Sequence, residues 1–144
     1  MRRFKSDIRV GTSGWHYSHW AGLFYPEKIP KSKWFNHYAK YFDTVEINNT
    51  FYQLPKEQTF KNWHNQASKI FLYTVKANRY ITHIKRLKDP KDSLQRFFER
   101  VRLLKQNLGP VLYQLPPNFQ KDLGRLKAFL FALPKGRIAV FEFR

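Results

Sequence analysis

The stretch that decides the fold reads Asp43-Thr44-Val45-Glu46-Ile47-Asn48-Asn49-Thr50-Phe51-Tyr52. Apolar and polar residues alternate in its first half, which is typical of a β-strand with one buried face. Val45 and Ile47 share one face, so Glu46 lies on the opposite face, and a polar, aromatic loop follows the strand. A carboxylate inside a sheet costs free energy unless it is paired or used. Glu46 is therefore the first candidate for a functional residue.

Similar strands recur along the chain, separated by helix patterns. Short apolar runs predict five strands, at residues 8–11, 43–48, 71–76, 111–115 and 137–144. Apolar residues at helical spacing predict four helices, at about residues 31–41, 57–67, 89–108 and 123–133. This alternation predicts an α/β fold with a parallel sheet and right-handed crossovers, either an open doubly wound sheet or a β/α barrel.

The third of these helices has the clearest end signals. Asp89 suits the N-cap, Pro90 suits the first helical position, and Gly109 suits the C-terminal cap. We therefore expect this helix to be the best defined of the four.

Composition limits the class of protein. The 144 residues fit one domain, spanning residues 1–144, and the 42% hydrophobic content is too high for disorder. No apolar run reaches the roughly 18 residues of a membrane span. No apolar signal-like segment follows the basic N-terminus, and cysteine is absent, which fits a reducing compartment. We therefore expect a cytoplasmic protein without a membrane partner.

Positive charge is the strongest compositional signal. The chain has 27 Lys and Arg residues against 10 Asp and Glu residues, which gives a net charge of +17. Such an excess favours a polyanionic partner, either nucleic acid or a phosphorylated small molecule. The alternative is a solvated basic surface without a specific ligand.

The predicted strands after the first share a polar residue at the end of their inward-facing row. The residues that the alternation places there are Glu46, Asn48, Lys76, Gln114, Glu142 and Arg144. In β/α barrels and in open parallel sheets alike, sites form at these carboxyl ends. We predict a pocket there in which Glu46, Lys76 and Glu142 are the catalytic acid–base groups and the other three bind the ligand. The alternative is an internal ion-pair network that only serves the fold.

The loops after the strands supply the remaining ligand-binding candidates. Gly11-Thr12-Ser13-Gly14 is a glycine turn whose backbone amides suit an anion, and a plain tight turn is the alternative. The other loop residues expected to contact a ligand, with the aromatic rings stacking on bases or sugars, are Trp15, Thr50, Phe51, Tyr52, Thr82 and His83.

Metal catalysis is a weaker alternative. His16, His19 and His83 have the chemistry to join the two glutamates at such a rim, as in metal-assisted phosphodiesterases or sugar isomerases. The strand ends also supply Asn, Lys, Gln and Arg, which are not the side chains that such metal clusters favour. We therefore predict neither a metal nor another cofactor.

Several motifs follow one another in an order that resembles a known family. They are Gly11–Trp15, Trp20–Pro26, Thr44–Tyr52, Val75–Ala77, Ile81–His83, Leu108–Pro117 and Phe141–Arg144. Together they resemble the YecE-like family, catalogued as domain of unknown function 72, over nearly the whole chain. The resemblance implies a TIM-like β/α barrel, which decides between the two architectures left open above. It also implies a pocket, but no particular reaction.

A complete barrel needs about 250 residues, and the fifth predicted strand ends at Arg144. We therefore expect the N-terminal portion of the family fold, an incomplete barrel of about five strands and four helices. Its last strand would be an unpaired edge, so a second copy or a second chain that completes the barrel is an expected partner.

Two functional hypotheses follow from the sequence. In the first, the rim binds an anionic or phosphate-bearing ligand, with nucleic acid as the leading candidate. In the second, the chain is an incomplete, inactive fragment whose polar network serves only the fold.

Overall fold

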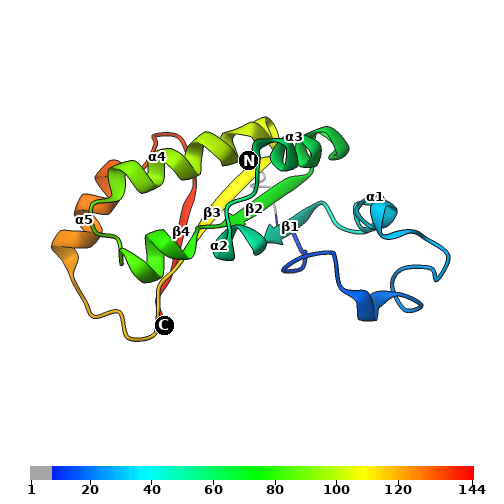
Figure 1. The fold of residues 1–144 in the computed structure, drawn as a ribbon, viewed down its shortest axis with the longest axis horizontal. Coiled ribbons are helices and arrows are strands. Elements are labelled where there is room, and N and C mark those ends of the chain that lie inside the picture. Colours follow the sequence, from blue (N-terminus) through cyan, green and yellow to red (C-terminus); the bar gives the residue numbers. More distant parts are fainter. Residues whose placement is uncertain (1–7) are drawn as a thin grey trace, which may run out of the picture.

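The computed structural model describes residues 8–144. Its centre is a parallel sheet of four strands in the order β1-β2-β3-β4 (Figure 1). The strands are β1 (Thr44–Ile47), β2 (Leu72–Lys76), β3 (Leu108–Gln114) and β4 (Ala139–Glu142). Because sequential strands are neighbours and helices lie between them in the chain, the arrangement is that of an incomplete β/α barrel. The predicted fold class is confirmed.

Five α-helices occur in the described residues. They are α1 (Trp34–Tyr38), α2 (Asn49–Tyr52), α3 (Glu57–Gln66), α4 (Pro90–Val101) and α5 (Leu123–Ala132). Helices α3 and α4 run along one side of the sheet, and α5 contacts α4 near β4 (Figure 1). The single-turn helix α2, which the sequence pattern does not predict, follows β1 almost at once. None of the helices in residues 8–144 is long and apolar enough to cross a membrane.

The alternation predicted along the strands is confirmed by burial. Val45 and Ile47 in β1 are at most 2% exposed, and Tyr73 and Val75 in β2 are fully buried. These residues belong to one hydrophobic core with the helices. The residues between them, Glu46 among them, are half-buried on the opposite face of the sheet.

Two tyrosine hydroxyls tie the N-terminal loop to this core. Tyr38 is fully buried; its hydroxyl accepts from the Thr12 amide at 3.0 Å and donates to the Thr44 carbonyl at 2.9 Å. Tyr25, also fully buried, donates to the Trp15 carbonyl at 2.6 Å. The loop is thereby fixed against β1, although it belongs to no strand.

One predicted strand is absent. Residues 8–11 join no ladder. The described chain has one backbone hydrogen bond between this region and β1, from the Glu46 amide to the Thr12 carbonyl at 2.9 Å. Arg9 instead holds the segment with its side chain, whose guanidinium bonds the Asp43 carboxylate at 2.7 Å. The apolar side chains of the segment are exposed, so no burial favours pairing. The sheet therefore has four strands in place of five.

The third predicted helix has the predicted start and a different end. Pro90 is its first residue. Asp89 stands at the N-cap position in a left-handed conformation with φ of 41°, and its carboxylate faces Lys85 at 3.5 Å without capping the helix. Gly109 lies inside β3, where a Cβ atom would be 3.1 Å from a β2 carbonyl oxygen, so it is not a cap. The helix is shorter than predicted because a 3-10 segment, Arg102–Asn107, leads into the strand.

The helices cover one face of the sheet. Parallel sheets ordinarily bury both faces. Here Leu72 and Leu112 on the second face are half-exposed, Val140 is 43% exposed, and a hollow of about 560 Å³ opens beside Leu72. Within residues 8–144, β4 pairs with β3 alone, so its outer edge is unpaired. Apolar open faces and free strand edges favour association.

We predict that the 144-residue chain self-associates through this open face and the β4 edge. Val140→Lys places a charge on the face and is expected to shift the population toward monomer in sedimentation velocity runs. Leu23→Lys adds the same charge in the N-terminal loop, at a residue that is 85% exposed, and is the control. A monodisperse monomer of the unmodified chain that melts cooperatively would contradict the prediction.

Candidate functional site

Because the strands are parallel, their carboxyl ends meet at one rim of the sheet. Glu46, Lys76, Gln114 and Glu142 stand at or near these ends, half-buried on the inner face. Gln114 donates to the Glu142 carboxylate at 2.8 Å, and the Arg144 Nε lies 3.6 Å from the same group. Within residues 8–144, neither Glu46 nor Lys76 forms an ion pair. The polar network is therefore confined to β3, β4 and the residues just after β4.

The glycine turn packs against β1. Gly11 lies so close to the strand that a Cβ atom would overlap a carbonyl oxygen, and Gly14 has a φ of 127°. The Thr12 amide already donates to the buried tyrosine of α1. Asn48, just past β1, donates to the Ser13 carbonyl at 3.0 Å. No acceptor in residues 8–144 bonds the Gly11, Ser13 and Gly14 amides, so the anion-binding prediction now concerns these three.

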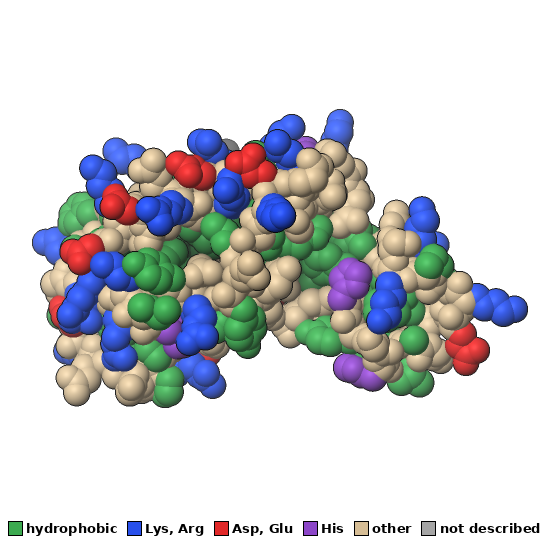
Figure 2. All heavy atoms as spheres, in the orientation of Figure 1, with side chains coloured by type: hydrophobic (Ala, Val, Ile, Leu, Met, Phe, Trp, Pro, Cys, Tyr) green, Lys and Arg blue, Asp and Glu red, His purple; other side chains and the backbone are tan. Residues whose placement is uncertain are grey.

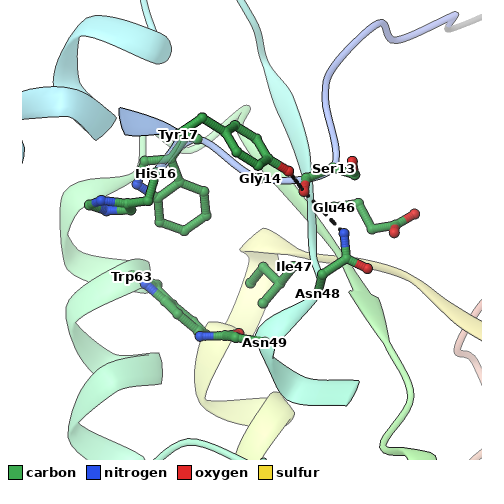
Figure 3. A pocket seen from close by; sticks show the side chains of 10 residues that line it. Ser13, Gly14, His16, Tyr17, Glu46, Ile47, Asn48, Asn49 and Trp63 are labelled. Carbon is green, nitrogen blue, oxygen red and sulfur yellow. Dashed lines mark hydrogen bonds between the residues drawn. The ribbon is translucent and has the colours of Figure 1, made fainter. Parts of the chain in front are cut away.

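A pocket of about 350 Å³ lies between this turn and α3 (Figure 3). His16 and Tyr17 lie on one side of it and Trp63 of α3 lies on the other, with Glu46 and Asn48 at the β1 end. The other residues of the turn and of α2 that line it are Ser13, Gly14, Trp15 and Asn49. Aromatic rings and a few polar groups are the usual lining of a small-molecule site.

A second group of predicted residues gathers around Lys76. Thr50 is fully buried and donates its hydroxyl to the Lys76 carbonyl at 2.7 Å. The Lys76 Nζ lies 5.0 Å from the centre of the Phe51 ring, and that ring lies 5.0 Å from the His83 ring. Thr82, also fully buried, shares a 2.8 Å hydrogen bond with the His83 Nδ1. The rim therefore brings together residues from β2 and from the segments after β1 and β2.

Thr82 and His83 belong to a single π-helical turn, η3 (Tyr80–Ile84). The Lys85 amide closes this turn by bonding the Tyr80 carbonyl at 2.8 Å. Such turns are rare and occur frequently at functional sites.

Four cations lie close enough to His83 to affect its ionisation: Lys76, Arg79, Arg86 and Arg144. We call these four residues the cationic cluster. Burial lowers the pKa of His83, and the positive charges of the cluster lower it further. The imidazole is therefore held in its neutral form, in which it is able to accept a proton.

Tyr52 does not join either group. Its side chain is 72% exposed, and its ring meets Phe51 edge-on at 5.1 Å.

The histidines considered as metal ligands do not form a metal-binding group with the acidic residues. Within residues 8–144, no three His, Asp or Glu side chains lie close enough to hold a metal ion.

Comparison with known proteins identifies the family. The family model described as "Protein of unknown function DUF72" matches residues 9–144. The chain belongs to the DUF72 family. The resemblance to the YecE-like family noted from the motifs is confirmed.

The curated DUF72 relatives are longer than this chain. UPF0759 protein YecE of Escherichia coli K12 is 30% identical over 128 residues, which are 88% of this chain and 44% of YecE. UPF0759 protein YunF of Bacillus subtilis strain 168 is 29% identical over 120 residues, which are 78% of this chain and 41% of YunF. The chain spans less than half the length of these relatives.

Solved DUF72 structures share the fold. A family member from Thermotoga maritima MSB8 superposes with a TM-score of 0.78 at 30% identity, over 92% of this chain and 55% of that one. A second, from Enterococcus faecalis V583, superposes with a TM-score of 0.74 at 18% identity, over 94% of this chain and 50% of that one. The second likeness concerns the fold alone.

The sequence analysis did not identify every residue of the pocket or of the cationic cluster. Tyr17, Asn49 and Trp63 line the pocket, and Arg79 belongs to the cationic cluster. Helical spacing indicates that Trp63 points inward, but not that it borders a cavity. Arg79 comes three residues after Lys76, and this closeness to a strand end was a usable signal.

We predict that Lys76→Ala raises the pKa of His83, because it removes one of the charges that disfavour the imidazolium. An NMR titration of the His83 ring proton measures the shift. Lys69→Ala, at an exposed residue before the amino end of β2, is the control and should leave the pKa of His83 unchanged. An equal shift in the pKa of His83 in the two variants would contradict the proposed arrangement of charges.

The lowered pKa also predicts how stability depends on pH. In the unfolded chain His83 takes up a proton near its ordinary pKa of 6.5, whereas in the folded chain it does so only at lower pH. The unfolded state therefore binds more protons as the pH falls through this window, and the free energy of unfolding decreases. Urea denaturation above and below the window should show a smaller decrease for Lys76→Ala than for the unmodified chain. An unchanged decrease would argue against this coupling.

Proposed function

We propose that the rim binds an anionic, phosphate-bearing ligand, with nucleic acid as the leading class. The observation that carries the proposal is the state of Lys76. Its ammonium has no carboxylate partner within residues 8–144 and lies over the Phe51 ring beside His83. A half-buried cation without a counter-ion has given up part of its hydration, so an anion that pairs with it gains more than it would at an open surface.

Two arginines that act on His83 together with this lysine support the same ligand class. Arg86 is held by Asn118, which accepts from its guanidinium at 3.0 Å through the side chain and at 2.7 Å through the carbonyl. Arg144 lies 3.6 Å from the Glu142 carboxylate. A guanidinium presents a planar fork of donors that matches phosphate oxygens. The fixed position of Arg86 lowers the entropy that binding would cost.

Charge beyond the rim favours a polymer over a small phosphorylated molecule. Figure 2 shows many Lys and Arg side chains, interspersed with fewer acidic ones, on the side of the molecule that carries α4 and α5, where most of the acidic side chains visible in this view also lie. A net charge of +17 attracts polyanions over a long range at low salt. A nucleic acid uses both the cationic cluster and the surrounding charge.

In this proposal the rim residues have different roles. Lys76 and Arg144 contact phosphate oxygens. Glu46 and Glu142 stand beside the bound ligand as the groups able to exchange protons with it, and neutral His83 is a further proton acceptor.

We predict that the chain binds a single-stranded oligonucleotide with an affinity that falls as salt rises, as measured by fluorescence anisotropy. Each phosphate contact with a single strand contributes about −0.7 to the slope of log K against log salt. Lys76→Ala is therefore expected to weaken binding and to make the slope shallower by about 0.7. Lys69→Ala removes the same charge near the opposite end of β2 and should leave the slope nearly unchanged.

Two results would count against the proposal. The first is the absence of any oligonucleotide binding at low salt. The second is an equal loss in the two variants, which would mean that overall charge, rather than the rim, is responsible.

A further inference from the structure

The cationic cluster is assembled from separate segments of the chain around one side chain. Lys76 is the last residue of β2, and Arg144 follows β4 by two residues. Arg79 directly precedes η3, and Arg86 follows that turn by two residues. All four act on the ionisation of His83. Cations grouped in this way favour one compact anion, whereas the successive phosphates of a strand favour cations in a row.

The register of the sheet places two members of the cluster on the same face. Lys76 pairs with Leu112 of β3, and Gln114, two residues further along, pairs with Glu142 of β4. Arg144 lies on the side of the Glu142 carboxylate, because its Nε is 3.6 Å from that group. The strand that carries Gln114 therefore lies between the strands that supply the two cations. Both cations have long side chains, so one ligand over β3 can meet both.

The charges of this rim do not cancel. The four cations of the cluster stand against two carboxylates, Glu46 and Glu142, which leaves an excess of two positive charges. His83 adds no further charge, because burial and the cluster lower its pKa. Within residues 8–144, Glu142 pairs with Arg144, and the other three members of the cluster form no ion pair. An anion with two charges neutralises this excess, whereas an anion with one charge neutralises half of it.

We propose that the cationic cluster binds a phosphomonoester, namely the phosphate at the end of a nucleic acid strand. This inference rests on the proposed function and names the part of the ligand that the rim recognises. A terminal phosphate carries between about −1.5 and −2 charges at pH 7, whereas each phosphodiester inside a strand carries one. It also presents three acceptor oxygens. Donors that approach from several segments can each contact one of these oxygens.

One short single-stranded oligonucleotide, prepared with a terminal hydroxyl, a terminal phosphate or a terminal methyl phosphate, tests this preference. The methyl phosphate is similar in size to the phosphate but is a diester with a single charge. Fluorescence anisotropy at low salt is expected to give roughly tenfold tighter binding of the phosphorylated strand than of the other two, because one more charge-assisted contact gives about that factor. The strands are compared in a 5′ set and in a 3′ set, and the preference in either set supports the inference.

Two variants test whether the preference arises at the cluster. Arg79→Gln and Lys76→Ala each remove one of its charges, so the preference is expected to fall to within about threefold. Arg102→Gln is the control and should preserve the full preference. Arg102 is an exposed residue at the start of the 3-10 segment that leads into the amino end of β3, away from the rim. Circular dichroism melts establish that each variant is folded.

His83 provides a second measurement, which locates the bound phosphate. An anion with two charges beside the imidazole favours its protonated form. Saturation with the phosphorylated strand should therefore raise the pKa of His83 in an NMR titration by more than saturation with the hydroxyl strand does. An equal rise with the two strands would place the terminal phosphate away from the cluster and contradict the inference.

The other failures are distinguishable. Equal affinity for the three strands in both sets overturns this inference and leaves the proposed function standing. Equal affinity for the phosphate and the methyl phosphate overturns the selection of a doubly charged group. A preference that persists in both Lys76→Ala and Arg79→Gln assigns the terminal phosphate to another site. Ribose 5-phosphate that binds as tightly as the phosphorylated strand overturns the assignment to a strand end. If none of the oligonucleotides binds, the inference and the proposed function both fail.

Discussion

The two-residue alternation of a parallel sheet is the constraint on which the rest of the structure depends. Burial of the apolar row of β1 against the helices fixes the face on which Glu46 lies, because a shift of one residue would exchange the two rows. The same register then places Lys76 of β2 diagonally beside Glu46. These two residues form no ion pair within residues 8–144, so their positions follow from core packing and not from attraction between them. A rim assembled in this way keeps charges available for a ligand.

Buried tyrosines extend this control from the sheet to the pocket. Burial raises the pKa of Tyr25 to about 12, so its hydroxyl stays protonated and donates to the Trp15 carbonyl at 2.6 Å. Burial likewise raises the pKa of Tyr73 in β2, whose hydroxyl donates to the Trp63 carbonyl at 2.9 Å. Trp15 and Trp63 both line the pocket, and each is held through its backbone by a phenol inside the core. The hydrophobic core thus positions the aromatic walls as well as stabilising the fold.

Local patterns in the sequence were sufficient to predict the fold class and the polar residues at the strand ends, because the alternation of a strand is visible within a few residues. They were insufficient to predict segments whose structure depends on residues distant in the sequence. Residues 8–11 have a strand pattern, but no apolar surface covers them, so they do not pair. Gly109 follows the predicted third helix in the sequence, as a C-terminal cap would, but it lies inside β3, close to the β2 backbone. The contact of Lys76 with Phe51 and the position of Trp63 at a cavity depend on tertiary structure, which local periodicity does not predict.

The π-helical turn η3 has a consequence for how this region can vary among relatives. A π turn contains about one residue more than an α turn. Loss of a residue from Tyr80–Ile84 would rotate the side chains that follow by about 100°, and His83 would then leave the neighbourhood of Phe51 and Lys76. The position of His83 at the rim therefore depends on the number of residues between β2 and His83 as well as on which residues they are. In an alignment of relatives, a gap at this turn would separate chains that keep the rim from chains that keep only the fold.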